Sequence, residues 1–266
     1  MTQILNYYGE AHTPFLHARG RSATLHLIGM IDCLPGEKIL EVGFGTGATL
    51  ALLASENRET EFYGAEASGK MFDIATSRLR FCGLENRIEL RLMNSPTVLP
   101  FEGNYFDKIY FESMLAIQED NKLHEMLSDI KRILKPDGIL VMNETIWLES
   151  TSLQKIRDVN EFCKKEFGII QANAKYPFLA DWKKLFQQLN FEILEVMNLD
   201  EVAPESGKLQ KRMLRSDLFT LIGKLKLRFK SKLRNESRLF QNKMNSLAAE
   251  QIQLMRGYLI KMKNSK

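Results

Sequence analysis

Cysteine is scarce in this 266-residue chain, which contains only Cys33, Cys82 and Cys163. The three lie far apart and none belongs to a CxxC pair, so the sequence indicates neither a disulfide framework nor a zinc site. No constellation of metal-ligating side chains stands out elsewhere in the sequence, and we predict no bound metal.

Long apolar runs are also missing. No stretch approaches the ~20 apolar residues that a membrane-spanning helix needs. The first twenty residues, MTQILNYYGEAHTPFLHARG, lack the continuous apolar core of a secretory signal. We therefore expect a cytoplasmic protein.

Neither sign of charge is in large excess. The 37 Lys and Arg residues oppose 33 Asp and Glu, for a net charge of +4, which is too small to indicate a nucleic-acid partner by itself. Hydrophobic residues make up 44% of the chain, which excludes general disorder. The length allows one large domain, or a core with an appendage.

Strands and helices alternate between about residues 38 and 147. The apolar patterns predict strands at Lys38–Val42, Glu61–Gly64, Arg87–Leu92, Lys108–Phe111 and Ile139–Met142, and helices at Ala48–Ser55, Lys70–Phe81 and from Asn121 to a stop at Lys135–Gly138. This alternation is typical of right-handed crossovers and of a parallel sheet covered on both faces.

The flanking segments complete the predicted fold. We expect helices at Arg21–Leu34, Ser152–Phe167 and Asp181–Leu189, and a long helical stretch from about Leu209 to Arg256. Strands are expected at Phe191–Met197 and Tyr258–Met262, the last of them antiparallel. The prediction is a doubly wound, mostly parallel seven-stranded α/β sheet. Its expected parts are an N-terminal lid and helix (1–36), a core (37–200 and 257–266) and a basic helical cap inserted before the last strand (201–256).

The most informative residues form a glycine loop, Glu41-Val42-Gly43-Phe44-Gly45-Thr46-Gly47, between a predicted strand and a helix. Glycines there let a ligand approach the backbone, and the carboxyl end of the first strand is where open α/β sheets bind ligands. Glu66 follows nineteen positions after Gly47, at the end of the second strand, where a carboxylate can accept hydrogen bonds from a ribose.

At these residues the chain resembles the class I S-adenosylmethionine-dependent methyltransferases. The resemblance covers about 110 residues through the segments ILEVGFGTG, GAEASGKMFDIA, MNSPTVLPFEGNYFDKIYFESML and RILKPDGILVMNE. It implies the Rossmann-like methyltransferase fold and S-adenosylmethionine as cofactor.

The resemblance also implies which residues bind the cofactor. The backbone of Gly43, Gly45 and Gly47 would meet its methionine part, while Glu41 orders the loop. The remaining implied contacts are Glu66 on the ribose hydroxyls, Met71 against the adenine, Asn94 and Ser95 beside the adenine, and Phe111 and Glu112 at the strand end under the cofactor. Asn94 stands where the family usually has aspartate. Ala116 and Ile117 replace two histidines that the family often has after the fourth strand.

Two other functions fit parts of the same pattern. Gly43 to Ala48 also satisfies the GxGxx(G/A) fingerprint of an NAD-dependent oxidoreductase, with Glu66 at a suitable distance. An acid directly before the first glycines suits S-adenosylmethionine better than a diphosphate, so we prefer the methyltransferase. A non-catalytic cofactor-binding protein is the second alternative.

Methyl transfer needs alignment and exclusion of water more than it needs a catalytic triad. In related enzymes the N-terminal segment folds over the cofactor, and we expect Tyr7, Tyr8 and His12 to line such a lid, with His12 as a candidate base. Glu144 is a second candidate catalytic residue, and it would face the acceptor together with Trp147. Met114 and Ile117 are expected to border the same pocket.

The sequence disfavours nucleic acid as the acceptor. The fourth strand is followed by Glu112-Ser113-Met114 instead of the (D/N)PP(Y/F/W) motif, and no cysteine occupies a Pro-Cys site. We expect a small-molecule acceptor, whose nucleophile can be oxygen, nitrogen or carbon.

Residues 208–234 concentrate the basic charge, with ten Lys and Arg against one acid, Asp217. Leucine and other apolar residues interleave with them, which predicts an amphipathic cap. A basic helix face that is simply exposed to solvent, with no binding function, is enough to explain this pattern. The functional alternatives are attraction of an anionic substrate, contact with an acidic membrane surface, and RNA binding, which is the weakest because Phe219 and Phe229 are the only aromatic residues in the segment.

Overall fold

A computed structural model describes residues 3–17, 19–203, 214–229, 235, 242–243 and 253–265. The strands are β1 (Lys38–Val42), β2 (Glu61–Glu66), β3 (Ile88–Leu92), β4 (Phe106–Glu112), β5 (Leu134–Trp147), β6 (Phe191–Asn198) and β7 (Met255–Asn264). The helices are α1 (Gln3–Glu10), α2 (Gly20–Ile31), α3 (Ala48–Glu56), α4 (Gly69–Cys82), α5 (Asp120–Ile133), α6 (Leu153–Phe167), α7 (Leu179–Gln188) and α8 (Leu214–Phe229).

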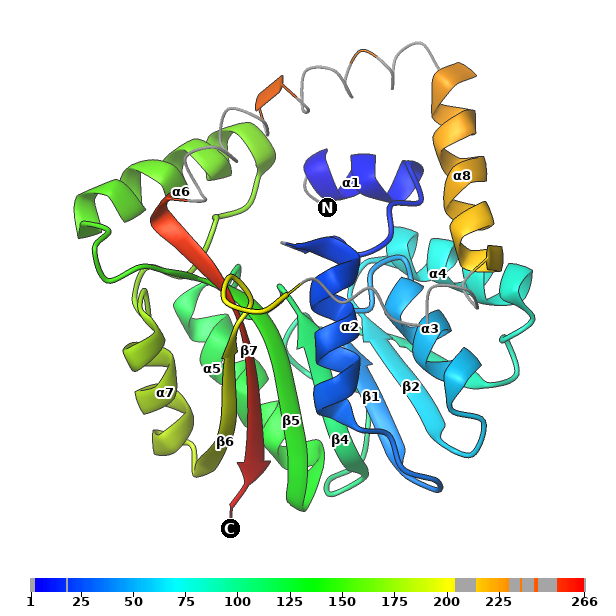
Figure 1. The fold of residues 1–266 in the computed structure, drawn as a ribbon, viewed down its shortest axis with the longest axis horizontal. Coiled ribbons are helices and arrows are strands. Elements are labelled where there is room, and N and C mark those ends of the chain that lie inside the picture. The colour runs from blue at the N-terminus through cyan, green and yellow to red at the C-terminus, as the bar shows by residue number, and fades with distance from the viewer. Residues whose placement is uncertain are drawn as a thin grey trace.

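All seven strands form one sheet in the order β3-β2-β1-β4-β5-β7-β6 (Figure 1). Strands β1 to β5 pair in parallel, as the alternation of strands and helices predicts. Strand β7 lies between β5 and β6 and is antiparallel to both, with Leu140 opposite Met262. The predicted doubly wound, seven-stranded fold with an antiparallel last strand is therefore confirmed.

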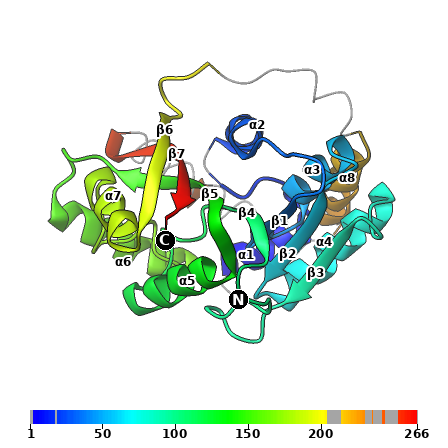
Figure 2. The ribbon, with the colours of Figure 1, turned by 90° about the horizontal axis from the view of Figure 1, so that it is seen from below.

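Helices cover both faces of the sheet, and each layer has its own core (Figure 2). Apolar residues of α2, α3 and α4, such as Leu27, Leu50 and Leu79, pack in a cluster on one face. Those of α5, α6 and α7, such as Leu127 and Trp182, pack in a cluster on the other. Because both faces are covered, ligands can reach the parallel strands only at their ends.

The start of α4 positions residues that matter for the site. The Ser68 hydroxyl accepts a hydrogen bond from the Met71 N–H at 3.2 Å and so caps the helix. The helix ends at Cys82, and the next residue, Gly83, has a φ of 72°, the left-handed conformation that glycine adopts without strain. Met71 is thereby held in the first turn, directly after the end of β2.

The turn predicted at Lys135–Gly138 has a different role in the structure. Helix α5 ends at Ile133, but β5 already begins at Leu134, which pairs with Phe106. The register then jumps to Lys108 opposite Ile139, so the intervening residues form an irregularity inside one long strand. The residues at 135–138 favour a local turn, but the pairing of Leu134 with Phe106 makes that turn part of strand β5.

Only part of the predicted 209–256 helical region can be compared with the structure. Residues 214–229 form α8, whereas Met255 and Arg256 belong to strand β7 because they pair with β5, and most of the remainder lies outside the described residues. The basic residues 208–213 and 230–234 also lie outside them. Within the described part of the chain, no helix combines the length and apolar character needed to cross a membrane.

Candidate active site

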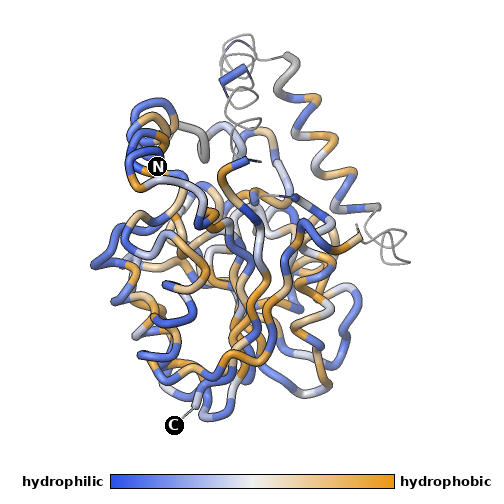
Figure 3. Tube along the Cα trace, turned by 60° about the vertical axis from the view of Figure 1, so that its left-hand side comes forward, coloured by the Kyte–Doolittle hydropathy of each residue, from blue (hydrophilic) through white to orange (hydrophobic). Residues whose placement is uncertain are grey.

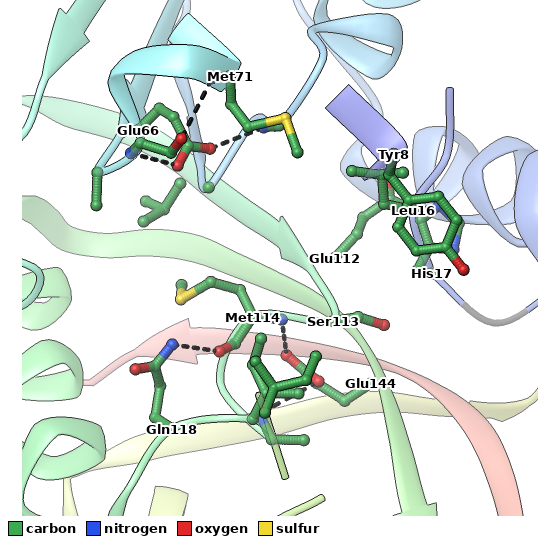
Figure 4. A pocket seen from close by; sticks show the side chains of 18 of the residues that line it. Tyr8, Leu16, His17, Glu66, Met71, Glu112, Ser113, Met114, Gln118 and Glu144 are labelled. Carbon is green, nitrogen blue, oxygen red and sulfur yellow. Dashed lines mark hydrogen bonds and ion pairs between the residues drawn. The ribbon is translucent and has the colours of Figure 1, made fainter. Parts of the chain in front are cut away.

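A cavity of about 560 Å³ opens at the carboxyl ends of the parallel strands (Figure 4). The loops after β1, β2, β3 and β4 form one side of it, and residues of β5 and α6 form another. The N-terminal segment contributes Tyr8, Thr13 and Phe15–His17 to the lining. The predicted lid therefore lies against the same space as the glycine loop.

The glycine loop adopts a backbone that other residues would strain. Gly43, Gly45 and Gly47 have φ values of 74°, 52° and 73°. A Cβ on Gly47 would lie 2.9 Å from the Cβ of Ala75 in α4, closer than side chains can approach. The backbone thus reaches the cavity at Gly43 and Gly45, while Gly47 lets α4 pack against the loop.

Glu66 joins the glycine loop to the start of α4. Its carboxylate accepts hydrogen bonds from the N–H of Gly45 and from the N–H of Ser68, each at 2.9 Å. Burial raises the pKa of Glu66, although the backbone donors oppose the shift. Glu66 and Met71, which the family resemblance assigns to the ribose and the adenine, both line the cavity.

Besides Gly47, four predicted cofactor residues do not line the cavity. Glu41 is buried beneath the loop, where it accepts a hydrogen bond from the Tyr110 hydroxyl at 2.8 Å and burial raises its pKa well above the usual value. Phe111 lies fully in the core. After β3, Met93 and Pro96 face the cavity instead of Asn94 and Ser95. Motif position alone does not tell which neighbour points inward.

Glu112 is the centre of a buried polar cluster at the end of β4. It accepts hydrogen bonds from Thr49 Oγ1 at 2.8 Å, Thr24 Oγ1 at 2.9 Å and Asn143 Nδ2 at 3.1 Å, and its Oε2 lies 2.9 Å from His17 Nε2. Burial alone would raise the pKa of Glu112, but His17 and the hydrogen bonds outweigh it, so the pKa lies below the ordinary value. This cluster anchors the N-terminal segment to the sheet.

His17 is the histidine that lines the cavity, and sequence reasoning did not select it. Besides Glu112, its ring contacts Asn143, whose Nδ2 lies 3.1 Å from Nδ1. His12, the predicted base, lies elsewhere: its ring stacks on Phe219 of α8 at 4.4 Å between centroids. No local signal in the sequence separates His17 from His12, because both are placed by contacts with distant segments.

Glu144 holds the loop that follows β4. Its Oε1 accepts the N–H of Met114 at 2.8 Å and of Leu115 at 2.7 Å, and its Oε2 accepts the N–H of Ala116 at 3.3 Å. Burial raises the pKa of Glu144 to about 7, although these donors oppose the shift. Glu144 also lines the cavity, so it both shapes this wall and presents a carboxyl to it.

The other expected acceptor-side residues divide into two groups. Tyr8, Met114 and Ile117 line the cavity, whereas Tyr7 and Trp147 do not. Trp147 is buried and its indole N–H donates to the Ala172 carbonyl at 3.4 Å, behind the lining.

The cavity wall is apolar and acidic. Its apolar members include Phe15, Leu16, Met126, Phe167, Ile169 and Ile170. Its charged members among the described residues are Glu66, Glu112 and Glu144, and no lysine or arginine of the described chain belongs to the lining.

Arg78 of α4 ties three segments together behind the glycine loop. Its side chain is fully buried and donates to the carbonyl of Thr46 at 2.8 Å, the carbonyl of His12 at 2.8 Å and the hydroxyl of Ser216 at 2.8 Å. It also donates to Thr220 Oγ1 at 3.1 Å. Burial lowers the pKa of the guanidinium to about 10, so it stays charged at neutral pH. The glycine loop, the N-terminal segment and α8 therefore share one hydrogen-bonded centre.

Helix α8 packs beside α4 and contributes no described residue to the cavity lining (Figure 1). A Cβ on Gly223 would lie 2.4 Å from the His12 ring, so the glycine is what lets α8 approach the N-terminal segment. Over its described residues, α8 therefore packs against the N-terminal segment from outside the cavity.

Comparison with known proteins identifies the core. A family model described as a methyltransferase domain matches residues 39–138. Methyltransferase GfsG of Streptomyces halstedii is 25% identical over 189 residues, which are 71% of this chain and 64% of that protein. Demethylmenaquinone methyltransferase of Tropheryma whipplei (strain Twist) is 30% identical over 141 residues, 53% of this chain and 51% of that protein. The chain thus spans between half and two thirds of the length of these two relatives.

Solved structures share the fold. A methyltransferase from Geobacter sulfurreducens in complex with S-adenosylhomocysteine superposes with a TM-score of 0.67 at 15% identity, covering 97% of both chains. The [4+2]-cyclase SpnF superposes with a TM-score of 0.63 at 18% identity, covering 91% of this chain and 79% of its own. Because a cyclase is among these structures, the fold alone does not fix the reaction.

Proposed function

Because the chain belongs to the class I S-adenosylmethionine-dependent methyltransferase family, we propose that it transfers a methyl group from S-adenosylmethionine to a neutral, largely apolar small molecule. The observation that carries the proposal is a single cavity whose wall joins Gly43, Gly45 and Glu66 to apolar side chains, with no lysine or arginine among its described residues. Cofactor and acceptor would meet in that cavity, away from bulk water.

The cofactor side fits the adenosyl and methionine parts of the proposed ligand. Gly43 and Gly45 leave their backbone open to it, and each Glu66 oxygen keeps a lone pair beyond the N–H group that it accepts, which suits ribose hydroxyls. Met71 supplies an apolar contact for a base. When bound, S-adenosylmethionine supplies an electrophilic methyl group on its sulfonium.

The same residues disfavour a dinucleotide. Glu66 and Glu112 flank the glycine loop, no described lysine or arginine belongs to the cavity wall, and His17 is already paired with Glu112. A positively charged sulfonium suits this acidic surrounding, whereas a second anion would be buried without compensation. The nicotinamide alternative therefore loses its physical support.

The acceptor side of the cavity disfavours negatively charged substrates. Glu112 and Glu144 face the cavity, and its remaining wall includes Phe15, Phe167 and Ile169. Burying a carboxylate or phosphate there would cost several kcal/mol. The demethylmenaquinone methyltransferase relative is named for an apolar quinone, which agrees in kind with this wall. Attraction of an anionic substrate by the basic segment is not supported.

The protein's own contribution would be positioning. Glu144 fixes the backbone of Met114 to Ala116, and the Glu112 cluster fixes His17 and with it the neighbouring Phe15 and Leu16. These two anchors fix neighbouring parts of the wall, so the acceptor would be oriented and water excluded. Methylation of a neutral hydroxyl releases a proton, and Glu144, which lines the cavity and has a pKa of about 7, would accept it.

Transfer of a labelled methyl group from S-adenosylmethionine tests the proposal. The panel should pair neutral apolar acceptors, such as quinols, phenols and hydroxylated polyketides, with anionic partners of matched size, such as prenyl diphosphates. We expect label to enter a neutral acceptor only. Label in the diphosphates alone would contradict the acceptor class, and binding of S-adenosylhomocysteine without transfer to any acceptor would favour the non-catalytic alternative.

A further inference from the structure

Helix α8 carries leucines on the face that points away from the protein, among the residues whose side chains the structure describes. Toward the protein it presents Ser216, Phe219, Thr220 and Gly223, all buried. Toward the outside it presents Leu218, Leu221 and Leu225, which are 48%, 51% and 43% exposed. These three leucines therefore do not serve the packing of α8 on α4.

The geometry of a helix makes this opposition regular. At about 100° per residue, the three leucines fall within an arc of about 60°, and the centre of that arc lies almost opposite the centre of the docked face. Figure 3 shows hydrophobic residues recurring along α8, which stands at the edge of the molecule. Phe81 of α4, 41% exposed and 5.8 Å from the Phe219 ring, adds apolar surface next to it.

The docked face is held by specific contacts, so the outward face is fixed as well. Arg78 donates to Ser216 and Thr220, and His12 stacks on Phe219 and fills the space beside Gly223. Because these contacts determine the rotation of α8 about its axis, the helix cannot turn its leucines inward without breaking them.

Basic side chains flank the leucine stripe. Arg215, Lys224 and Lys226 of α8 are exposed, against one exposed acid, Asp217. The sequence on both sides adds more positive charge, with Lys208, Lys211, Arg212, Lys230, Lys232 and Arg234. Apolar residues on one face bordered by lysine and arginine are the pattern of a helix that lies in the interface of a membrane with anionic lipids.

We propose that the outward face of α8, formed by Leu218, Leu221 and Leu225 with Arg215, Lys224 and Lys226 at its borders, binds the surface of an anionic lipid membrane. The leucines insert among the acyl chains, and the cations lie at the level of the lipid phosphates. Attachment is peripheral, and it is independent of the acceptor that the cavity takes.

The position of this surface gives it a use. α8 contacts the N-terminal segment through His12, and the next residue of that segment, Thr13, lines the cavity. A membrane bound at α8 therefore lies next to the lid, where an apolar acceptor dissolved in lipid would arrive. This use rests on the proposed function, whereas the binding itself does not.

Flotation of the full chain with lipid vesicles tests the surface directly. Vesicles of equal parts phosphatidylglycerol and phosphatidylcholine are compared with vesicles of phosphatidylcholine alone. We expect the chain to float with the anionic vesicles, at least tenfold less with the neutral ones, and several-fold less when salt rises from 0.1 to 0.5 M. The variant L218S/L221S/L225S should lose at least tenfold in binding, as should K224E/K226E.

A matched control uses exposed leucines away from α8. Leu153 and Leu194 are 54% and 46% exposed, and L153S/L194S should float like the unchanged chain. All variants should retain the affinity for S-adenosylhomocysteine, which separates failure of this surface from failure of the proposed function. The thermal midpoint of the triple leucine variant should also be unchanged.

Three results would overturn the proposal. One is absence of flotation, or equal flotation with neutral vesicles. Another is a dimer in light scattering that the triple leucine variant abolishes, because the leucines would then cover a second copy of this chain. The third is a large fall in thermal midpoint in that variant, because the leucines would then pack against another part of the same chain.

Discussion

The two sides of the cavity are built in different ways. The cofactor side comes mostly from backbone and from one acid, within the 26 residues that run from Glu41 to Glu66. The acceptor side comes from side chains of distant segments, including Phe15, Met114, Glu144 and Phe167. A short motif can therefore specify the first, whereas the second exists only after the whole chain has folded.

This difference also separates the expected consequences of mutation. Changes in the glycine loop should act on the affinity for S-adenosylhomocysteine, and changes on the acceptor side should leave that affinity intact. The following variants test the separation, from the largest expected effect on affinity to the smallest.

The largest effect is expected from Gly47→Ala. Both Gly47 and Gly36 have a left-handed backbone, with φ of 73° and 79°, but a Cβ on Gly47 would clash with Ala75 while one on Gly36 would meet nothing within 4 Å. Gly36→Ala should cost about 1 kcal/mol of unfolding free energy from backbone strain, and Gly47→Ala about 2–4 kcal/mol. Calorimetric titration should show at least tenfold weaker S-adenosylhomocysteine binding for Gly47→Ala alone. Equal effects of the two would show that the Ala75 contact is irrelevant.

A smaller effect on affinity is expected from Arg78→Met. The substitution leaves the carbonyls of Thr46 and His12 and the hydroxyl of Ser216 without their buried donor. We expect a loss of about 2–4 kcal/mol in unfolding free energy, faster amide exchange in α8 and a few-fold weaker S-adenosylhomocysteine binding. Arg80→Met, at an exposed position of the same helix, is the control and should change stability by less than about 0.5 kcal/mol. Unchanged exchange in α8 would refute the shared centre.

Glu144→Gln should leave the affinity for S-adenosylhomocysteine within twofold and change the pH dependence of stability. The pKa of Glu144 is about 7 in the folded state against an ordinary 4.5, so the folded state binds this proton more tightly than the unfolded state. The resulting stabilisation is complete below pH 4.5 and is lost as pH rises through 7. At about 1.4 kcal/mol per pKa unit, it amounts to roughly 3 kcal/mol.

Denaturant unfolding at several pH values between 4.5 and 8 measures this term. Over this interval the unfolding free energy of the unchanged chain should fall by that amount more than the unfolding free energy of Glu144→Gln does. Glu149→Gln, at an exposed position just after β5, should behave like the unchanged chain. If the unfolding free energies of Glu144→Gln and of the unchanged chain change with pH in the same way, a raised pKa at Glu144 is contradicted.

The same contrast explains what could be predicted from the sequence. The order of strands and helices, the glycine loop and Glu66 follow from periodicity and spacing, which are local properties of the chain. Glu41 belongs to the same motif. Its hydrogen bond with Tyr110, however, depends on the pairing of β4 with β1, which the motif does not reveal.

The histidines show where such reasoning stops. His12 and His17 lie five residues apart in one segment, and nothing local distinguishes their surroundings. Glu112, Thr24 and Asn143 bring His17 to the cavity, whereas Phe219, more than 200 residues away, holds His12 outside it. Selecting between them requires knowledge of long-range packing.

The central claim is that the glycine loop and Glu66 form an S-adenosylmethionine site, and titration of S-adenosylhomocysteine into three chains tests it most directly. Glu66→Gln removes the charge and one of the two acceptor oxygens, and the exposed Glu59→Gln is the control. We predict that the unchanged chain and Glu59→Gln bind alike, that Glu66→Gln binds at least tenfold more weakly, in keeping with about 1.5–3 kcal/mol for a charged hydrogen bond, and that NADH does not bind. Equal affinity for all three chains, or binding of NADH in place of S-adenosylhomocysteine, would contradict the account.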